Sequence, residues 1–290
     1  MFGGFFANIQ SAVLQDLFVN LYSPDVFIST RKGDKNWNSP IMNVRRSSGN
    51  AEKEFYFDSN GTISLSSEDG SGTSLGTWAG SDTVYVQTWY DQSGNGRDMV
   101  QNNASTQPIL INAGSLVTEN SRTAISFNGD YMFGNNPPSY SDFSIYGVTT
   151  SKDTKTRNNC WVSCGGSTNG LFLFNQLTSG YGLSRIRSGS STIQYDSNYN
   201  VDLSGVQGVF VAQSISEQLQ MFFNNSSGTT SATYPSVGFT GTNFYLGANS
   251  IIPSSIYLIG TIQEFTMFAS DVSSNRATIQ DNQNSYYNVY

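Results

Sequence analysis

Short runs of β-branched and aromatic residues recur along most of the chain, and Gly, Asn, Asp and Ser residues separate them. Runs of this kind, bounded by turn-forming residues, predict β-strands. The runs lie at 26–30, 41–48, 53–58, 84–90, 123–129, 131–134, 143–150, 159–165, 170–176, 181–188, 191–196, 206–215, 218–225, 243–248 and 256–269. Because no helical stretch interrupts them, we expect an all-β fold, a two-sheet antiparallel sandwich in one domain over residues 26–290.

Two stretches at the ends of the chain are predicted to be helical instead. Apolar residues recur at i, i+3, i+4 and i+7 ahead of Pro24, which predicts a short amphipathic helix. These residues are Leu14, Leu17, Phe18 and Leu21. We expect residues 1–25 to form an arm that docks on a neighbouring subunit, with the chain's own sandwich as the alternative surface. A second short helix is predicted over 273–290, with Ser273 or Ser274 as its N-cap.

The N-terminal stretch is apolar enough to be compared with a signal peptide. Its first basic residue is Arg31, Asp16 interrupts it, and no small-residue cleavage site follows, so it does not match a classical signal peptide. It is also too polar to span a bilayer. We therefore expect neither a classical signal peptide nor a membrane span.

Composition supports strands and turns and narrows the possible functions. Charged residues make up only 12% of the chain, about half the usual fraction, whereas 28 Gly suit many tight turns. The net charge of −7 argues against a nucleic-acid partner. Histidine is absent, which excludes a Ser–His triad and any His metal site. The two cysteines, Cys160 and Cys164, cannot complete a zinc site alone; a short-loop disulfide and two buried thiols both stay open.

The stretch TWYDQSGNGRDMVQ contains D-x-S-x-N-G, which matches the first six positions of a calcium-binding loop. The candidate ligands are Asp91, Ser93 and Asn95. Asn102 stands where a bidentate Glu is needed, and the flanks are predicted strands rather than helices. We favour the alternative in which Asp91 and Asn95 bond to nearby backbone N–H groups while Gly94 and Gly96 take positive φ.

Arg45 and Arg46 are neighbours in a predicted strand, so their side chains point to opposite faces. We expect one of them to lie in water and the other to be buried against a carboxylate, with Asp91 as the preferred partner. This structural pairing is favoured over contact with a sugar or a phosphate.

Several segments together resemble a known family. VRRSSGNAEKEFYFDSNG, WYDQSGNGRDMVQ, RTAISFNGDYM and the closing IQEFTMFASDVSSNRATIQDNQNSYYNVY resemble the catalytic domain of the α-L-arabinofuranosidase B family. They also resemble the concanavalin-like, lectin-type domains related to it in bacterial, phage and viral surface proteins. The resemblance covers about residues 26–290 and implies a jelly-roll sandwich. Its signature residues are Arg45, Arg46, Trp89, Tyr90, Asp91, Gly94, Asn95 and Gly96.

The resemblance also implies where catalytic carboxylates would stand. A retaining glycosidase needs two, about 5 Å apart. In the family the nucleophilic Glu follows an adjacent Cys–Cys pair, but here the cysteines are not adjacent and no Glu lies between Glu119 and Glu217. The family's acid/base Asp is replaced in LGANS by Ala248 and Asn249. We therefore expect no catalytic residues and no enzyme activity. Carboxylates left for an unfamiliar glycosidase are Asp130, Asp142 and Glu264.

Aromatic side chains would be needed for a sugar site, because sugar rings stack on them. The candidates are Trp161, Tyr181, Tyr195 and Tyr199. In a sandwich with 19 Phe and 16 Tyr, most aromatic residues belong to the core, so packing is the competing explanation for each.

These observations favour a non-enzymatic structural or surface protein, with a virion component (capsid-decorating, minor capsid or fibre) as the first candidate. The alternative is a carbohydrate-binding module that recognises cell-surface glycans; a degenerate arabinofuranosidase-type glycosidase ranks third. The expected partners are other subunits of an assembly and glycans, at a virion or an extracellular or cell surface. No cofactor is expected, apart from calcium in the 91–96 loop.

Overall fold

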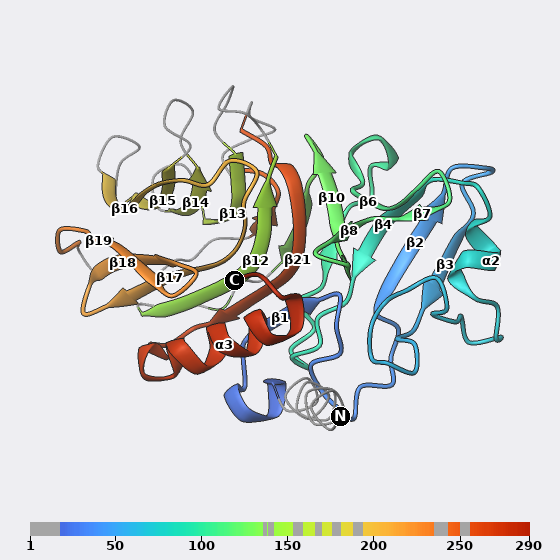
Figure 1. Cartoon of the computed structure of the whole chain (residues 1–290), viewed down its shortest axis with the longest axis horizontal. Helices are drawn as coiled ribbons and strands as arrows, with labels where there is room; N and C mark the ends of the chain where they lie inside the picture. The colour runs from blue at the N-terminus through green and yellow to red at the C-terminus, as the bar shows by residue number, and fades with distance from the viewer. Residues whose placement is uncertain are drawn as a thin grey trace, which may run out of the picture.

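The computed structural model describes residues 18–135, 138, 142–152, 159–165, 170–175, 181–187, 194–234, 243–249 and 256–290. Within these ranges, every pair of neighbouring strands is antiparallel, as predicted from the sequence. Figure 1 shows β2, β3 and α2 at one end of the molecule and β16–β19 at the other. The predicted jelly-roll sandwich is confirmed.

One layer of the sandwich has β21 at its centre. β21 pairs with β12 along one edge and with β1 and then β10 along the other, and the layer continues through β17 to β19 and through β10 to β6. Its strands are β1 (Val26–Ser29), β6 (Ile109–Asn112), β10 (Ile125–Asn128), β12 (Phe143–Ser151), β17 (Gln207–Ile215), β18 (Gln218–Phe223), β19 (Ser226–Thr230) and β21 (Ile259–Phe268).

The second layer continues from strand to strand in the order β5, β11, β20, β13, β14, β15 and β16. Its strands are β5 (Met99–Val100), β11 (Met132–Asn135), β20 (Asn243–Leu246), β13 (Asn159–Gly165), β14 (Gly170–Asn175), β15 (Tyr181–Arg187) and β16 (Gln194–Asp202). Small additions are β7 (Ser115–Leu116), which pairs with β6, and the separate ribbon of β8 (Thr118–Glu119) and β9 (Arg122–Thr123).

The two layers are joined at β4 (Val84–Trp89), which is a departure from two separate sheets. One edge of β4 pairs with β2 (Met42–Arg46), which in turn pairs with β3 (Glu52–Phe55). The other edge is shared: the start of β4 pairs with β6 and its end pairs with β5. Because β4 pairs with both β6 and β5, the described strands other than β8 and β9 form one continuous hydrogen-bonded sheet.

The interior between the layers is filled by alternate residues of these strands. Val44, Val86 and Trp89 are fully buried there, together with Phe265 of the opposite layer. At the start of β4 the buried residues Val84 and Val86 alternate with the half-buried Tyr85 and Gln87, which is the period of two expected of a half-buried sheet. The short helix α2 (Leu75–Ala79) closes the core near β3 and was not predicted, because five residues carry too little periodicity.

The outer face of the β12–β21 layer is covered by the C-terminal helix α3 (Arg276–Tyr287), as Figure 1 shows. The predicted helix is confirmed, but its predicted N-cap is wrong. A 3-10 turn from Ser273 to Asn275 precedes α3, and the carboxylate of Asp271 caps this turn by accepting from Ser273 N at 2.8 Å.

The described end of the N-terminal arm packs on the chain's own sandwich. Residues 18–22 are helical, and the fully buried ring of Phe18 stacks on that of Phe27 at a centroid distance of 4.8 Å. The described end of the arm therefore contacts the chain's own sandwich, which was the alternative to the favoured neighbouring subunit. Residues 1–17, including Leu14 and Leu17, lie outside the described residues. In the described part, no helix is long and apolar enough to cross a membrane.

Candidate functional site

The signature loop after β4 is held by its own side chains. Asp91, only 3% exposed, accepts hydrogen bonds at Oδ1 from Phe27 N and Ser93 N, and at Oδ2 from Ser93 Oγ and Arg97 N, all at 2.7–3.0 Å. Asn95 donates from its side chain to the carbonyl of Asp25. These bonds use both carboxylate oxygens of Asp91 to fix the loop on β1.

The glycines of this loop take the backbone conformation expected of them. Gly94 has φ 85° and Gly96 has φ 66°, the left-handed region that favours glycine. Across the described ranges, no group of three or more Asp, Glu or Cys side chains is arranged to hold a metal ion. The loop therefore has the geometry of the backbone-capping interpretation.

Arg45 does not pair with Asp91, so that prediction is wrong. Its guanidinium donates from Nε to Gln107 at 2.7 Å and from Nη1 to Asn50 at 2.7 Å, and it lies 4.4 Å from the centre of the Tyr85 ring. Arg45 is 8% exposed. The register of β2, β4 and β6 brings Gln107 close, which the sequence separation of 62 residues hides.

Arg46 points to the opposite face, as predicted, but it does not lie free in water. It is half-buried, donates to the carbonyl of Trp78 at 3.0 Å and lies over the Trp78 ring. Both arginines therefore stack on aromatic rings and brace β2. Of the two signature aromatics, Trp89 anchors the loop, because it is fully buried and donates from Nε1 to the carbonyl of Ser29 at 3.1 Å, whereas the Tyr90 hydroxyl donates to Glu54.

Two of the four predicted sugar-contacting aromatics are packed against the core. Trp161 is 1% exposed and its ring lies 5.0 Å from that of Phe210, so its prediction as a sugar platform is wrong. Tyr199 is half-buried and packs at 5.6 Å against the Phe223 ring. The backbones of Tyr181 and Tyr195 belong to β15 and β16, but their side chains lie outside what the structure describes.

The two segments where the resemblance places catalytic carboxylates lie side by side. Val162 of β13 pairs with Leu246 of β20, and Ser163 Oγ donates to the carbonyl of Ala248 at 2.8 Å. Ser163, Ala248 and Asn249 are all nearly inaccessible to solvent. Neither 159–165 nor 243–249 contains Asp or Glu, so these neighbouring strands offer no carboxylate.

The other carboxylates named for an unfamiliar glycosidase lie apart. Glu264 is completely buried under α3, where Arg31 and Gln283 donate to it. Asp142 directly precedes β12 and accepts from Ser214 Oγ at 3.3 Å. Asp130 lines a pocket on the outer face of the sheet.

The pocket with Asp130 opens on the outer face of β2, β4 and β6 and has a volume of about 410 Å³. We call it the Arg45 pocket. It is lined by Arg45, Ser47, Tyr85, Ala104, Ser105, Gln107, Ile109, Asn128 and Asp130. Its floor is fixed, because Gln107 accepts from Arg45 and donates to the carbonyl of Gln101 at 2.8 Å. Three of the five N–H donors of Arg45 are used within the protein.

Asp130 is the chemically distinctive group of this pocket. It is half-buried, and its Oδ2 accepts from the backbone N–H of Asn128 at 3.0 Å. No ion pair joins Asp130 to any Lys or Arg in the described part of the chain. Burial raises the pKa of the Asp130 carboxyl above 3.8, and the Asn128 N–H partly offsets this. A carboxylate with spare acceptor capacity therefore faces the cavity.

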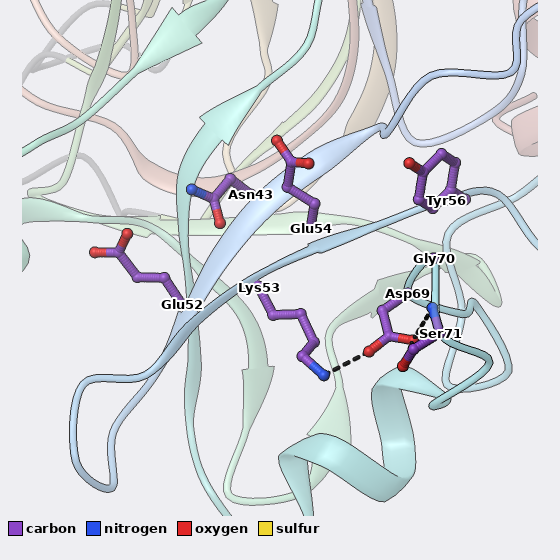
Figure 2. A pocket seen from close by; sticks show the side chains of 8 residues that line it. All are labelled: Asn43, Glu52, Lys53, Glu54, Tyr56, Asp69, Gly70 and Ser71. Carbon is purple, nitrogen blue, oxygen red and sulfur yellow. Dashed lines mark hydrogen bonds and ion pairs between the residues drawn. The ribbon is translucent and has the colours of Figure 1, made fainter.

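A second pocket, of about 570 Å³, runs along the edge strand β3, and we call it the Glu54 pocket. It is lined by Asn43, Glu52, Lys53, Glu54, Tyr56, Asp69, Gly70 and Ser71. Figure 2 shows Asn43, Glu52 and Glu54 on one side of β3, while Lys53 reaches Asp69 on the other at 2.5 Å. The hydrogen bond from Lys53, followed by that from Ser71, lowers the pKa of Asp69.

Sequence reasoning did not find most of these residues. Tyr85, Gln107 and Asn128 were not candidates, and Asp130 was named only as a glycosidase carboxylate. One signal was available: in VYVQ the polar or amphipathic residues Tyr85 and Gln87 alternate with buried valines, which marks the outer face of β4.

Comparison by sequence finds no matching protein-family model and no matching curated protein. Solved structures share the fold. An arabinofuranosidase complexed with arabinofuranosyl-α-1,2-xylobiose aligns with a TM-score of 0.66 at 15% identity, over 94% of this chain and 65% of that one. A GH54 α-L-arabinofuranosidase, a Glu→Gln mutant soaked with 4-nitrophenyl α-L-arabinofuranoside, gives 0.64 at 12% identity, over 91% and 63%.

The receptor-binding domain of botulinum neurotoxin D gives a TM-score of 0.51 at 12% identity, over 67% of this chain and 50% of that one. The chain spans 65% and 63% of the two arabinofuranosidase chains, slightly less than two thirds. At these identities the likeness is one of fold. The chain therefore has the concanavalin-like jelly-roll fold of the arabinofuranosidase catalytic domain and of lectin-like binding domains.

Proposed function

We propose that this chain is a non-catalytic surface protein that binds glycans, and that a sugar occupies the Arg45 pocket. The observation that carries the proposal is the position of Asp130, a half-buried carboxylate without a cationic partner in the described part of the chain. A carboxylate in that position is an acceptor for ligand hydroxyl groups. The expected setting, a virion or a cell surface with other subunits as partners, belongs to the same proposal.

The rest of the pocket has groups suited to a sugar. The side chain of Asn128 is exposed at the rim and can both donate and accept. Arg45 covers one face of the Tyr85 ring, so Ile109 and the part of Tyr85 that Arg45 leaves uncovered supply apolar surface for the C–H face of a sugar ring. Arg45 and Gln107 hold each other, so the pocket is formed before a ligand arrives and binding orders few side chains.

We propose a non-catalytic role because glycosidase chemistry requires two carboxylates facing one sugar. Among the residues that the structure describes, Asp130 is the only carboxylate that lines the Arg45 pocket. Glu264 and the neighbouring β13 and β20 segments do not supply a second one, because Glu264 is sealed under α3 and those segments contain none. Arabinofuranosidases with this fold have been complexed or soaked with arabinofuranosyl sugars, so in those proteins the fold binds sugars.

A glycan array with the native protein, Asp130→Asn and Asp281→Asn tests the proposal. Asp281 is an exposed carboxylate on α3 and serves as the matched control. We expect the native protein and the control to bind the same glycans, and Asp130→Asn to bind at least about tenfold more weakly, because a hydrogen bond to a charged group is lost. Absence of binding to every glycan, or equal binding by Asp130→Asn, would overturn it.

A second assay separates binding from catalysis. We expect no hydrolysis of an aryl α-L-arabinofuranoside by the native protein. Hydrolysis that disappears in Asp130→Asn would instead assign the pocket to a glycosidase.

A further inference from the structure

The Arg45 and Glu54 pockets are neighbours on one face of the sheet. Arg45 of β2 lies directly opposite Glu52 of β3 in the antiparallel register, and each residue lines one of the two pockets. The Cα atoms of such a pair are about 4.5–5.5 Å apart. The pockets therefore meet at this rung of the sheet, with no element between them.

A polar floor continues across the boundary. Gln87 of β4 accepts from Asn43 Nδ2 at 2.8 Å and donates to Glu52 Oε1 at 3.1 Å. Asn43 in turn lies opposite Glu54 in the register. The side chains of Asn43, Gln87 and Glu52 lie on the outer face of β2, β4 and β3. The alternate residues Met42, Val44 and Phe55 are buried on the other face.

The charges of the two pockets select against acidic ligands. Four carboxylates line them, from Glu52, Glu54, Asp69 and Asp130, against two cationic side chains, Lys53 and Arg45. Lys53 is paired with Asp69, whereas the partners of Arg45 are the neutral side chains of Gln107 and Asn50 and the carbonyl of Ala104. Three carboxylates therefore remain against the one guanidinium charge of Arg45. A ligand carboxylate or sulfate would meet more negative than positive charge, whereas hydroxyl groups would meet acceptors.

We infer that the two pockets form one groove that takes an extended, neutral oligosaccharide, with further sugar units crossing from the Arg45 pocket over Glu52 toward Glu54. This inference rests on the proposed function and goes beyond it in naming the length and charge of the glycan. The carboxylate of Glu54 receives the Tyr90 hydroxyl on Oε1, which orients it at the far end of the groove.

Calorimetric titration with neutral arabino-, xylo- and cello-oligosaccharides, each as a disaccharide and a hexasaccharide, tests the groove. In the series that binds, we expect the hexasaccharide to bind at least about tenfold more tightly than the disaccharide, because hydrogen bonds to charged acceptors are added. In Glu54→Ala the hexasaccharide loses most of this advantage, whereas Asp281→Ala, the control, keeps it. An oligogalacturonate hexasaccharide, which is anionic, binds more weakly than the neutral one.

The outcomes separate the two proposals. If neither the array nor the titrations show binding, both fail. If glycans on the array bind but none of these oligosaccharides does, only the extended groove fails. If the disaccharide binds and Asp130→Asn weakens it, but the hexasaccharide binds no more tightly or Glu54→Ala has no effect, only the extended groove fails. If the anionic hexasaccharide binds as tightly as the neutral one, the selection for neutral glycans fails.

Discussion

Arg31 and Glu264 form a bidentate ion pair that is almost completely excluded from solvent. Arg31 Nε lies 2.6 Å from Glu264 Oε2, and Arg31 Nη2 lies 3.0 Å from Oε1, while the two side chains are 1% and 0% exposed. Gln283 of α3 donates to Glu264 Oε1 at 3.0 Å, and the Tyr287 hydroxyl lies 3.3 Å from Oε2. The pair therefore links β21, the segment after β1 and the C-terminal helix.

Removing one partner of this pair should strongly destabilise the fold. We expect Glu264→Gln to lower the free energy of unfolding by about 3–5 kcal/mol, because the Arg31 charge stays buried without its counter-charge. The urea-induced unfolding of the native protein and the variant, followed by circular dichroism, measures this.

The control is the double variant Arg31→Met with Glu264→Leu, which removes both charges. It should be more stable than Glu264→Gln, because no unpaired charge remains. A double variant less stable than Glu264→Gln would contradict this account of the pair.

Asp91→Asn should weaken the signature loop. The substitution puts an amide N–H₂ where an oxygen now accepts hydrogen bonds, so at least one donor among Phe27 N, Ser93 N and Arg97 N loses its partner. We expect a loss of about 2 kcal/mol in the free energy of unfolding, measured in urea. Asp281→Asn, on the exposed face of α3, should leave it unchanged, and an Asp91→Asn variant as stable as this control would refute the assignment.

Chelation should not change the stability of this loop. Both oxygens of Asp91 are already occupied by four donors, so a calcium ion would have to displace those bonds. We expect the same Tm in EDTA and in millimolar calcium, measured by differential scanning calorimetry. A Tm that falls in EDTA and recovers with calcium would favour the calcium-loop interpretation of Asp91, Ser93 and Asn95.

The long strands could be predicted from the sequence because apolar residues recur along their whole length. The runs 143–150 and 256–269 correspond to β12 and β21, which are buried along nearly their whole length. The two-residue strands β5, β7, β8 and β9 could not be predicted, since two residues contain no period. Nor could the joining of the layers at β4, because register is set by pairing between distant segments.

The candidate site was harder to predict than the fold for the same reason. The Arg45 pocket draws Arg45, Tyr85 and Asp130 from segments far apart in sequence, and no local spacing connects them. The sequence predicted that one of Arg45 and Arg46 is buried against a carboxylate, with Asp91 preferred, but it did not say which one. The register instead brings Gln107 and Asn50 within reach of Arg45.

Cys160 and Cys164 should be unreactive in the native protein. Both are buried and they are not bonded to each other, which answers the choice left open by their spacing. Burial raises the pKa of the Cys160 thiol, so little thiolate forms at neutral pH. We expect no labelling by iodoacetamide without denaturant and labelling of both thiols in urea, measured by mass spectrometry. Rapid labelling of Cys160 in the native protein would contradict the packing of β13.

The raised pKa of Asp130 predicts opposite effects of pH on glycan binding and on stability. Ligand hydroxyl groups donate to the carboxylate, so binding should weaken as the pH falls through the raised pKa, at a higher pH than an ordinary Asp with a pKa of 3.8 would give. For folding the sign is reversed. A raised pKa means that the folded state favours the protonated form, so the contribution of Asp130 to stability rises as the pH falls through the same window.

Asp130→Asn isolates both effects, because other carboxylates titrate equally in the two proteins. At neutral pH the variant should bind glycan at least about tenfold more weakly yet unfold in urea no more easily than the native protein. Toward low pH both differences should shrink, since native Asp130 becomes protonated and then resembles the amide. If Asp130→Asn loses both stability and glycan binding at neutral pH, Asp130 is a structural residue. A ligand-binding carboxylate whose burial is unfavourable in the free protein should instead lose binding and keep stability.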